Sequence, residues 1–318
     1  MIASEGEQVS GDAAVEVVWE PSAEDLTEGR VPLWWTVGPA GELGVLFVDR
    51  GKLRQSPYVK GWVGWTPESV CDGLLVTRHA DGSMQRQAIG AIPTGTSHIA
   101  FLPDARLVLV EGRVPRGEPG SWPPNAMVLS AEGEQQVAFC IGDDIDVAVT
   151  DRGGSIWTAY GDEGIYGGHP QSAAGLAGWG DRGQVVWAPG GRLPEWPLAG
   201  FAAATERDQV WLAWYSSSRE GHTFLTRIVP LTGEVTSWRS PVRSPDGLAV
   251  RGDRAILTRR HHNKRSTEVF RAELVDDAWT VTDRREVAVP GRVVMRCGQG
   301  RDGFLWLRTG DVWLRIEA

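Results

Sequence analysis

The stretch IDVAVTDRGGSIWTAY, Ile145–Tyr160, decides the fold. It begins with a short apolar run, continues through a turn rich in Asp and Gly, and ends in a run that contains Trp and Tyr. β-Branched and aromatic residues favour strands, whereas Asp and Gly favour tight turns. The stretch therefore predicts two antiparallel strands joined by a hairpin turn.

The same unit recurs along the chain. The other copies are Leu33–Val48, His98–Val110, Phe201–Tyr215, Leu248–Thr258 and Val293–Leu307. Equivalent positions in their second strands are 62, 49, 54, 46 and 49 residues apart, and they are Leu46, Val108, Trp157, Trp211, Leu257 and Trp306. A fixed period of this length is the signature of a repeat architecture. The three tryptophans at repeat spacing are expected to lie in the core.

Each unit is followed by two more predicted strands. In the fourth unit these are His222–Pro230 and Glu234–Arg239, joined by a Leu-Thr-Gly turn. A glycine directly before the last strand supplies the positive φ that such turns need. Six repeats of four antiparallel strands predict an all-β protein, a six-bladed β-propeller that forms a single domain over residues 1–318. A two-sheet sandwich is the alternative, and regular repeats fit it less well.

The two ends of the chain supply the last blade. After Phe304–Arg308 and Asp311–Ile316 the sequence ends one strand short of a complete repeat. Residues 14–19 (AVEVVW) provide a spare strand near the N-terminus. Pairing it with the C-terminal hairpin would close the ring and cover two sheet edges. We expect residues 1–13, which are polar and acidic, to be flexible.

One segment also resembles a known group of proteins. Gly142–Trp187 contains the loop DEGIYG between an aromatic strand and a closing hairpin. In this arrangement it is similar to uncharacterised bacterial, mainly actinobacterial, β-propeller proteins. The resemblance covers about 45 residues, implies six blades, and implies no activity.

Composition narrows the classes of partner. The chain has 40 Gly and 19 Pro, which disfavours a helical bundle, and its formal net charge is −9, which disfavours nucleic acid as partner. No apolar run is long enough to span a membrane, and the N-terminus lacks the apolar core of a secretory signal. We expect a cytoplasmic protein whose Cys71, Cys140 and Cys297 are reduced thiols.

A binding site is expected on the face that carries the longer connections. In a propeller this face holds the loops from outer to inner strands and from second to third strands, and loops on a rigid scaffold carry function. Two second-to-third loops, Asp49–Asp72 and Gly161–Ala174, exceed what a hairpin needs. The predicted ligand-binding residues are Trp34, Trp62, Trp65, Asp162, Glu163 and Tyr166. The tryptophans of the first loop also fit a packing role.

The candidate catalytic residues lie on the same predicted face. Histidine is the side chain suited to a general base near neutral pH, and carboxylates suit general acids or ligands. The candidates are His98, Asp146, His169, His222 and Asp246. No zinc-ligand spacing or nucleotide-binding loop is present, so the cofactor is unknown. Converging carboxylates such as Asp143, Asp144 and Asp146 would suit calcium, although Asp is also an ordinary turn residue.

Two functions remain open from the sequence. The first is a binding module that recognises a partner protein or small ligand on the loop-rich face around the central channel. The second is a small-molecule hydrolase, lyase or cyclase whose active site lies at the channel mouth. The enzyme hypothesis requires the five candidate catalytic residues to share a pocket, and the binding hypothesis does not. Because no catalytic motif is present, binding is favoured.

Overall fold

The computed structural model describes residues 15–55, 64–114, 118, 121–261 and 265–318. Within these residues the chain consists mainly of β-strands joined by turns. The helices among them are α1 (Asp162–Tyr166) and the 3-10 helices η1 (Thr27–Gly29), η2 (Arg50–Lys52), η3 (Pro103–Ala105) and η4 (Ser172–Ala174). No helix in the described part is both long enough and apolar enough to cross a membrane.

The strands form four-stranded antiparallel units, which we call blades and name after their innermost strands. The β2 blade contains β2 (Arg30–Val37), β3 (Leu43–Asp49), β6 (Cys71–Arg78) and β7 (Met84–Ile92), with the added hairpin β4 (Leu53–Gln55) and β5 (Trp65–Pro67). The β8 blade contains β8 (Thr96–Phe101), β9 (Leu107–Glu111), β10 (Ala126–Leu129) and β11 (Gln135–Phe139). The β12 blade contains β12 (Ile145–Thr150), β13 (Ile156–Tyr160), β14 (Leu176–Trp179) and β15 (Val185–Trp187).

The remaining blades come from the second half of the chain and its N-terminal strand. The β16 blade contains β16 (Pro197–Glu206), β17 (Gln209–Ser216), β18 (Thr223–Val229) and β19 (Glu234–Arg239). The β20 blade contains β20 (Gly247–Arg251), β21 (Arg254–Arg260), β22 (Ser266–Val275) and β23 (Ala278–Ala288). The β24 blade contains β24 (Val293–Arg301), β25 (Phe304–Thr309), β26 (Val312–Glu317) and β1 (Glu16–Trp19).

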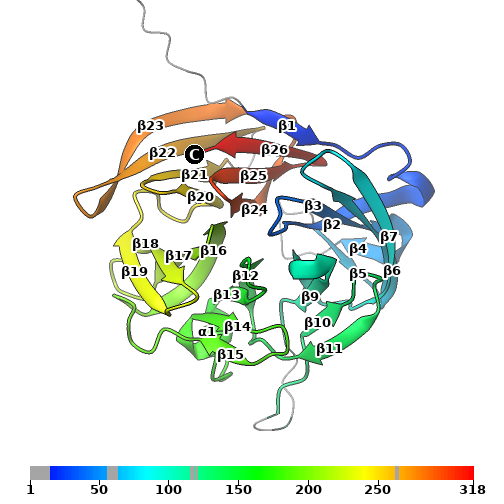
Figure 1. The fold of residues 1–318 in the computed structure, drawn as a ribbon, viewed down its shortest axis with the longest axis horizontal. Helices are drawn as coiled ribbons and strands as arrows, with labels where there is room; N and C mark the ends of the chain where they lie inside the picture. The colour runs from blue at the N-terminus through cyan, green and yellow to red at the C-terminus, as the bar shows by residue number, and fades with distance from the viewer. Residues whose placement is uncertain (1–14, 56–63, 115–117, 119–120, 262–264) are drawn as a thin grey trace, which may run out of the picture.

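The blades are arranged around a common centre, so the fold is a β-propeller (Figure 1). Inner strands such as β2, β12, β16 and β24 lie near the middle of the view, and outer strands such as β7, β11, β19 and β23 lie at the rim. The hairpin predicted for each repeat, and the two further strands predicted for the fourth repeat, correspond to strands of these blades. The predicted pairing of the N-terminal strand with the C-terminal hairpin is also present, with Glu16 opposite Arg315 and Val17 opposite Leu314. Residues 1–13 lie outside the described residues.

Hydrophobic clusters fill the interfaces between neighbouring blades. The tryptophans at repeat spacing are buried as predicted, with exposed fractions of 1% for Trp157, 2% for Trp211 and 4% for Trp306. Trp306 and Trp313 of the β24 blade pack with Val45 and Phe47 of the β2 blade. The core is therefore distributed over the seams between blades, because each blade hides its apolar faces against its neighbours.

Glycines set the outer hairpin turns, as the sequence predicted. Gly133, Gly183 and Gly233 each precede the fourth strand of a blade and have φ of 88°, 82° and 70°. Residues with a Cβ rarely adopt this left-handed backbone. The turns therefore require these glycines, and packing adds a second reason at Gly183, where an added Cβ would lie 2.5 Å from Phe139 Cβ.

The inner strands come closer together than the sequence indicated. β16 and β24 pair in parallel, with Ala203 opposite Gln299 and Thr205 opposite Arg301. Small residues permit this approach: a Cβ added at Gly300 would lie 2.2 Å from the Leu248 carbonyl oxygen. β20 also lies in direct contact with both of these strands.

Candidate functional site

A pocket of about 750 Å³ lies between the β8 and β12 blades. Its wall is supplied by four connections, which join β7 to β8, β9 to β10, β11 to β12 and β13 to β14. These are outer-to-inner and second-to-third connections, so the pocket lies on the face that the sequence predicted to be rich in loops. The lining residues are Thr94, Gly95, Glu111, Arg113, Val114, Asp143, Glu163, Tyr166 and Gly167.

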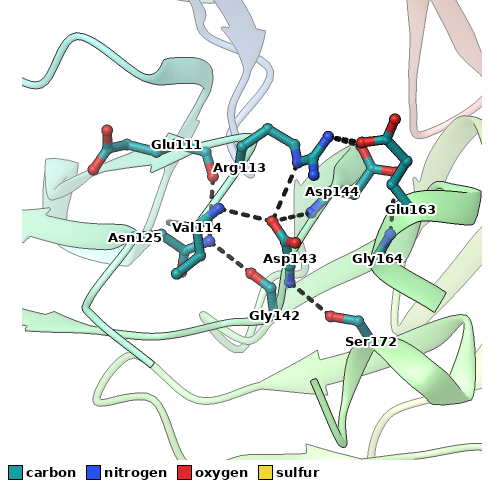
Figure 2. Close-up of polar contacts among 10 residues, drawn as sticks. All are labelled: Glu111, Arg113, Val114, Asn125, Gly142, Asp143, Asp144, Glu163, Gly164 and Ser172. Carbon is teal, nitrogen blue, oxygen red and sulfur yellow. Dashed lines mark hydrogen bonds and ion pairs between the residues drawn. The ribbon is translucent and has the colours of Figure 1, made fainter. Parts of the chain in front are cut away.

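Asp143 fixes the geometry of the pocket wall (Figure 2). Its Oδ1 accepts hydrogen bonds from the Val114 backbone N–H at 2.7 Å and the Asp144 N–H at 2.9 Å. The backbone N–H of Asp143 in turn donates to Ser172 Oγ at 2.6 Å. Asp143 is only 5% exposed. A buried carboxylate that satisfies backbone donors from two connections holds both in one arrangement.

Arg113 lies over this carboxylate and is surrounded by acidic groups. Its Nε is 3.3 Å from Asp143 Oδ1, its Nη1 pairs with Glu163, and Asp144 Oδ1 is 4.0 Å away. Burial alone would lower the pKa of Arg113, but its hydrogen bond with Glu163 and the nearby carboxylates raise it. Burial raises the pKa of Asp144, against the opposing effect of Arg113. Arg113, the cation among the described lining residues, is therefore already paired with Asp143 and Glu163.

Glu111 is the carboxylate that Arg113 does not reach. Figure 2 shows its side chain directed away from Arg113. One oxygen, Oε2, accepts the Gly95 backbone N–H at 3.1 Å. Within the described part of the chain Glu111 forms no ion pair with Lys, Arg or His. Burial raises the pKa of Glu111 because the charged form is poorly solvated there.

The short helix α1 brings two predicted ligand-binding residues, Glu163 and Tyr166, to the pocket. Gly164 lies so close to the preceding loop that an added Cβ would be 2.0 Å from the Asp143 carbonyl oxygen. Only glycine permits this approach. Tyr166 is 67% exposed at the end of the helix. Asp162, the third predicted residue of this loop, is exposed and does not line the pocket.

The structure places three candidate catalytic residues on inner strands or at their starts, where they form hydrogen bonds between or within blades. His98 Nε2 is 3.0 Å from the Ile145 carbonyl oxygen, which links the β8 and β12 blades. Asp146 is 6% exposed, and its Oδ2 accepts the Gly200 N–H at 3.2 Å, which links the β12 and β16 blades. Asp246 accepts the Arg260 N–H at 3.0 Å within the β20 blade.

The other two candidate histidines lie in separate second-to-third connections. His222 lies between two carboxylates, with Nδ1 2.7 Å from Glu195 Oε1 and Nε2 2.9 Å from Glu220 Oε2. His169 is 4% exposed, and its Nε2 is 3.3 Å from Cys140 Sγ.

The Cys140–His169 pair was not predicted and has the spacing of a nucleophile and its base. Its electrostatics oppose that role. Burial lowers the pKa of His169 and raises the pKa of Cys140, so both groups favour their neutral forms. A thiolate is the reactive form of cysteine, and this environment disfavours it. Trp122 packs edge-on against His169 at a centroid distance of 4.7 Å, which supports a packing role.

Two predicted aromatic residues of the first repeat, Trp34 and Trp65, do not line the pocket. Trp34 is 6% exposed and packs in the cluster between the β2 and β8 blades. Trp65 is partly buried against the same cluster, with the Arg50 guanidinium 5.1 Å from its ring centroid. Trp62 lies outside the described residues. The packing alternative given above describes Trp65 well.

The described residues contain no group of three or more His, Cys, Asp and Glu side chains that could hold a metal ion. Two charged residues of the pocket, Glu111 and Arg113, were among the lining residues that were not predicted. Their signal in the sequence was their position at the end of β9, where a second strand leads into a long connection. That position places side chains on the loop-rich face.

Comparison with known proteins adds little about the site. No protein-family model and no curated protein matches the chain. Among solved structures, an inactive variant of virginiamycin B lyase from Staphylococcus aureus with quinupristin is 10% identical, with a TM-score of 0.47 over 96% of this chain and 99% of that one. Hydrazine synthase from Kuenenia stuttgartiensis is 11% identical, with a TM-score of 0.49 over 90% and 95%. Sqt1 from Saccharomyces cerevisiae is 9% identical, with a TM-score of 0.45 over 89% and 80%. These likenesses are too distant to carry an argument about activity.

Proposed function

We propose that the chain is a single six-bladed β-propeller domain that acts as a ligand-binding module. The β1–β26 pairing and the hydrophobic cluster between the β24 and β2 blades support a closed ring. A closed ring gathers the connections between its strands on the loop-rich face, where they can contact a ligand.

The pocket between the β8 and β12 blades is the observation that carries this proposal. Its volume of about 750 Å³ is in the range of small-molecule sites in proteins. It is built from four connections, and the hydrogen bonds of Asp143 and Ser172 join three of them, those that follow β9, β11 and β13. A pocket with a pre-formed wall loses little conformational entropy on binding, and this favours affinity for a small ligand.

Binding is favoured over catalysis for a structural reason. None of the five candidate catalytic residues lines this pocket or two further pockets on the described part of the chain. Several of them instead hydrogen-bond to backbone groups of the propeller. Cys140 and His169 are held in their neutral forms. The pocket wall thus presents recognition groups without a neighbouring nucleophile and base.

Retention of small molecules from a cell metabolite extract tests the proposal. Thr94 is an exposed lining residue, so Thr94→Trp should fill the pocket without disturbing the core. Thr280→Trp on the exposed outer strand β23 is the matched control. After equilibrium dialysis and mass spectrometry, wild type and Thr280→Trp should retain the same compound, and Thr94→Trp should lose it. Equal retention by all three proteins, or retention by none, would contradict the proposed site.

A further inference from the structure

Among the described residues, Glu111 has no cationic partner, and Arg113, the cation that lines the pocket there, already pairs with other carboxylates. The carboxylate is partly buried, and Gly95 N–H at 3.1 Å is its side-chain hydrogen-bond donor. Arg113 is committed to Asp143 and Glu163 on the other side of the wall (Figure 2). A partly buried carboxylate without a counter-ion is destabilised unless a cation joins it.

A second group beside Glu111 also lacks a partner. Thr96 is 6% exposed, and its Oγ1 forms no hydrogen bond in the described structure. Thr96 and Glu111 lie directly opposite each other in the β8–β9 ladder. Side chains opposite each other in an antiparallel pair lie on the same side of the sheet. The unused hydroxyl therefore lies on the same side of the β8–β9 ladder as the Glu111 carboxylate, and Thr96 directly follows the lining residue Gly95 in the chain. A hydroxyl can accept a hydrogen bond from an N–H donor.

The rest of the pocket excludes an anionic ligand and favours an organic one. Among the described lining residues, the carboxylates of Glu111, Asp143 and Glu163 outnumber the one guanidinium, that of Arg113. An acidic group entering this pocket would meet net negative charge. Tyr166 offers an exposed aromatic ring and Val114 an apolar surface. An aromatic ring attracts a cation over its face and packs against the carbon skeleton of a ligand.

We propose that the pocket binds an organic cation whose ammonium group pairs with the Glu111 carboxylate and donates to Thr96 Oγ1. This assignment rests on the proposed ligand-binding function and names its ligand class. The ammonium anchors the ligand at Glu111, while its hydrocarbon part extends along Val114 toward Tyr166. Arg113 stays paired with Asp143 and Glu163 and keeps the wall in place.

The test uses three probes of similar size and different charge. Phenethylammonium, phenethyl alcohol and phenylacetate are titrated into wild type, Glu111→Gln, Thr96→Val and Glu134→Gln. Glu134 is exposed in the β10–β11 turn at the other end of the blade, so it is matched in charge but distant from the pocket. Binding is followed by ligand-observed NMR and calorimetry.

The proposal predicts that phenethylammonium binds wild type at least tenfold more tightly than the alcohol, and that phenylacetate binds weakest. Glu111→Gln should reduce phenethylammonium affinity at least tenfold, because a charge-assisted hydrogen bond becomes neutral. Thr96→Val should reduce it about threefold, and Glu134→Gln should leave it unchanged.

Two other outcomes distinguish an error in the cation assignment from an error in the proposed ligand-binding function. The alcohol or phenylacetate could bind wild type but not Thr94→Trp, with Glu111→Gln leaving that affinity unchanged. In that case the pocket is a ligand site but the cation assignment is wrong. If no probe binds and no metabolite is retained by wild type, the proposed function itself is wrong. Equal loss in Glu111→Gln and Glu134→Gln would show a nonspecific effect of net charge and would overturn the cation assignment.

Discussion

Asp143→Ala should destabilise the protein by about 2–4 kcal/mol, because Asp143 holds the pocket wall. The substitution removes the acceptor of the buried Val114 N–H at 2.7 Å and of the Asp144 N–H at 2.9 Å. A buried donor without a partner costs about 1–3 kcal/mol, and the partly exposed Asp144 N–H lies at the lower end of that range. The lost pair with Arg113, whose side chain is 57% exposed, adds at most about 1 kcal/mol.

Urea denaturation of wild type and Asp143→Ala gives the free energy of unfolding, and hydrogen exchange gives the protection of individual amides. The Val114 and Asp144 amides should lose protection, while amides in the distant β20 blade should not. Asp81→Ala is the control, since Asp81 accepts from the Ser83 N–H at 2.9 Å in an exposed turn where water can replace it. A loss of stability no larger in Asp143→Ala than in Asp81→Ala would refute this account of the wall.

The other predictions concern the blade seams, the α1 loop and two titrating groups. Arg308 is buried and donates to the carbonyl oxygens of Pro32 at 2.8 Å and Leu33 at 3.0 Å, so Arg308→Met should cost about 3–5 kcal/mol in urea denaturation. The partly exposed Arg315, which pairs with Glu16, is the control, and Arg315→Met should cost about 1 kcal/mol. Gly164→Ala should cost about 1–3 kcal/mol in the same assay, because its Cβ would meet the Asp143 carbonyl oxygen. Burial opposes ionisation of Glu195, but Ser216, Ser218 and His222 lower its pKa to about 2 from 4.5. Wild type should therefore have a larger free energy of unfolding than Glu195→Gln above pH 4.5, and this difference should vanish as the pH falls toward 2. Cys140 in the native protein should react with iodoacetamide at least tenfold more slowly than a free thiol at pH 7, measured by site-resolved mass spectrometry, because burial raises its pKa.

The fold could be predicted from the sequence because its signal is local and repeated. Each hairpin such as Ile145–Tyr160 carries its own strand and turn preferences, and the spacing of Trp157, Trp211 and Trp306 marks the same core position in the β12, β16 and β24 blades. The turn glycines Gly183 and Gly233 were equally readable, because positive φ excludes most other residues.

The contact of inner strands could not be predicted in the same way. Ala203, Gly298 and Gly300 read as ordinary strand residues with weak β preference. Their role emerges only when β16, β20 and β24 meet, because small side chains let backbones approach. The neighbours of each residue come from segments about 50 to 100 positions away in the chain.

The candidate site was predictable as a face and as one loop, but not in its chemistry. The loop of α1 was found from its length, and Glu163 and Tyr166 do line the pocket. Glu111 and Arg113 were missed because their roles depend on which carboxylates lie beside the Arg113 guanidinium. Asp143 and Glu163, which pair with Arg113, come from other connections, so the sequence alone does not show these pairs. The histidines were chosen by residue type, and the structure shows His98 and His169 in contacts within the propeller.

A crystal structure of the protein soaked with phenethylammonium at neutral pH tests the central claim most directly. The account predicts difference density in the pocket between the β8 and β12 blades, with the ammonium nitrogen within about 3 Å of a Glu111 carboxylate oxygen and the phenyl ring toward Tyr166. Ordered compound at another place, with this pocket holding solvent only, would contradict the claim that the pocket is a site for organic cations.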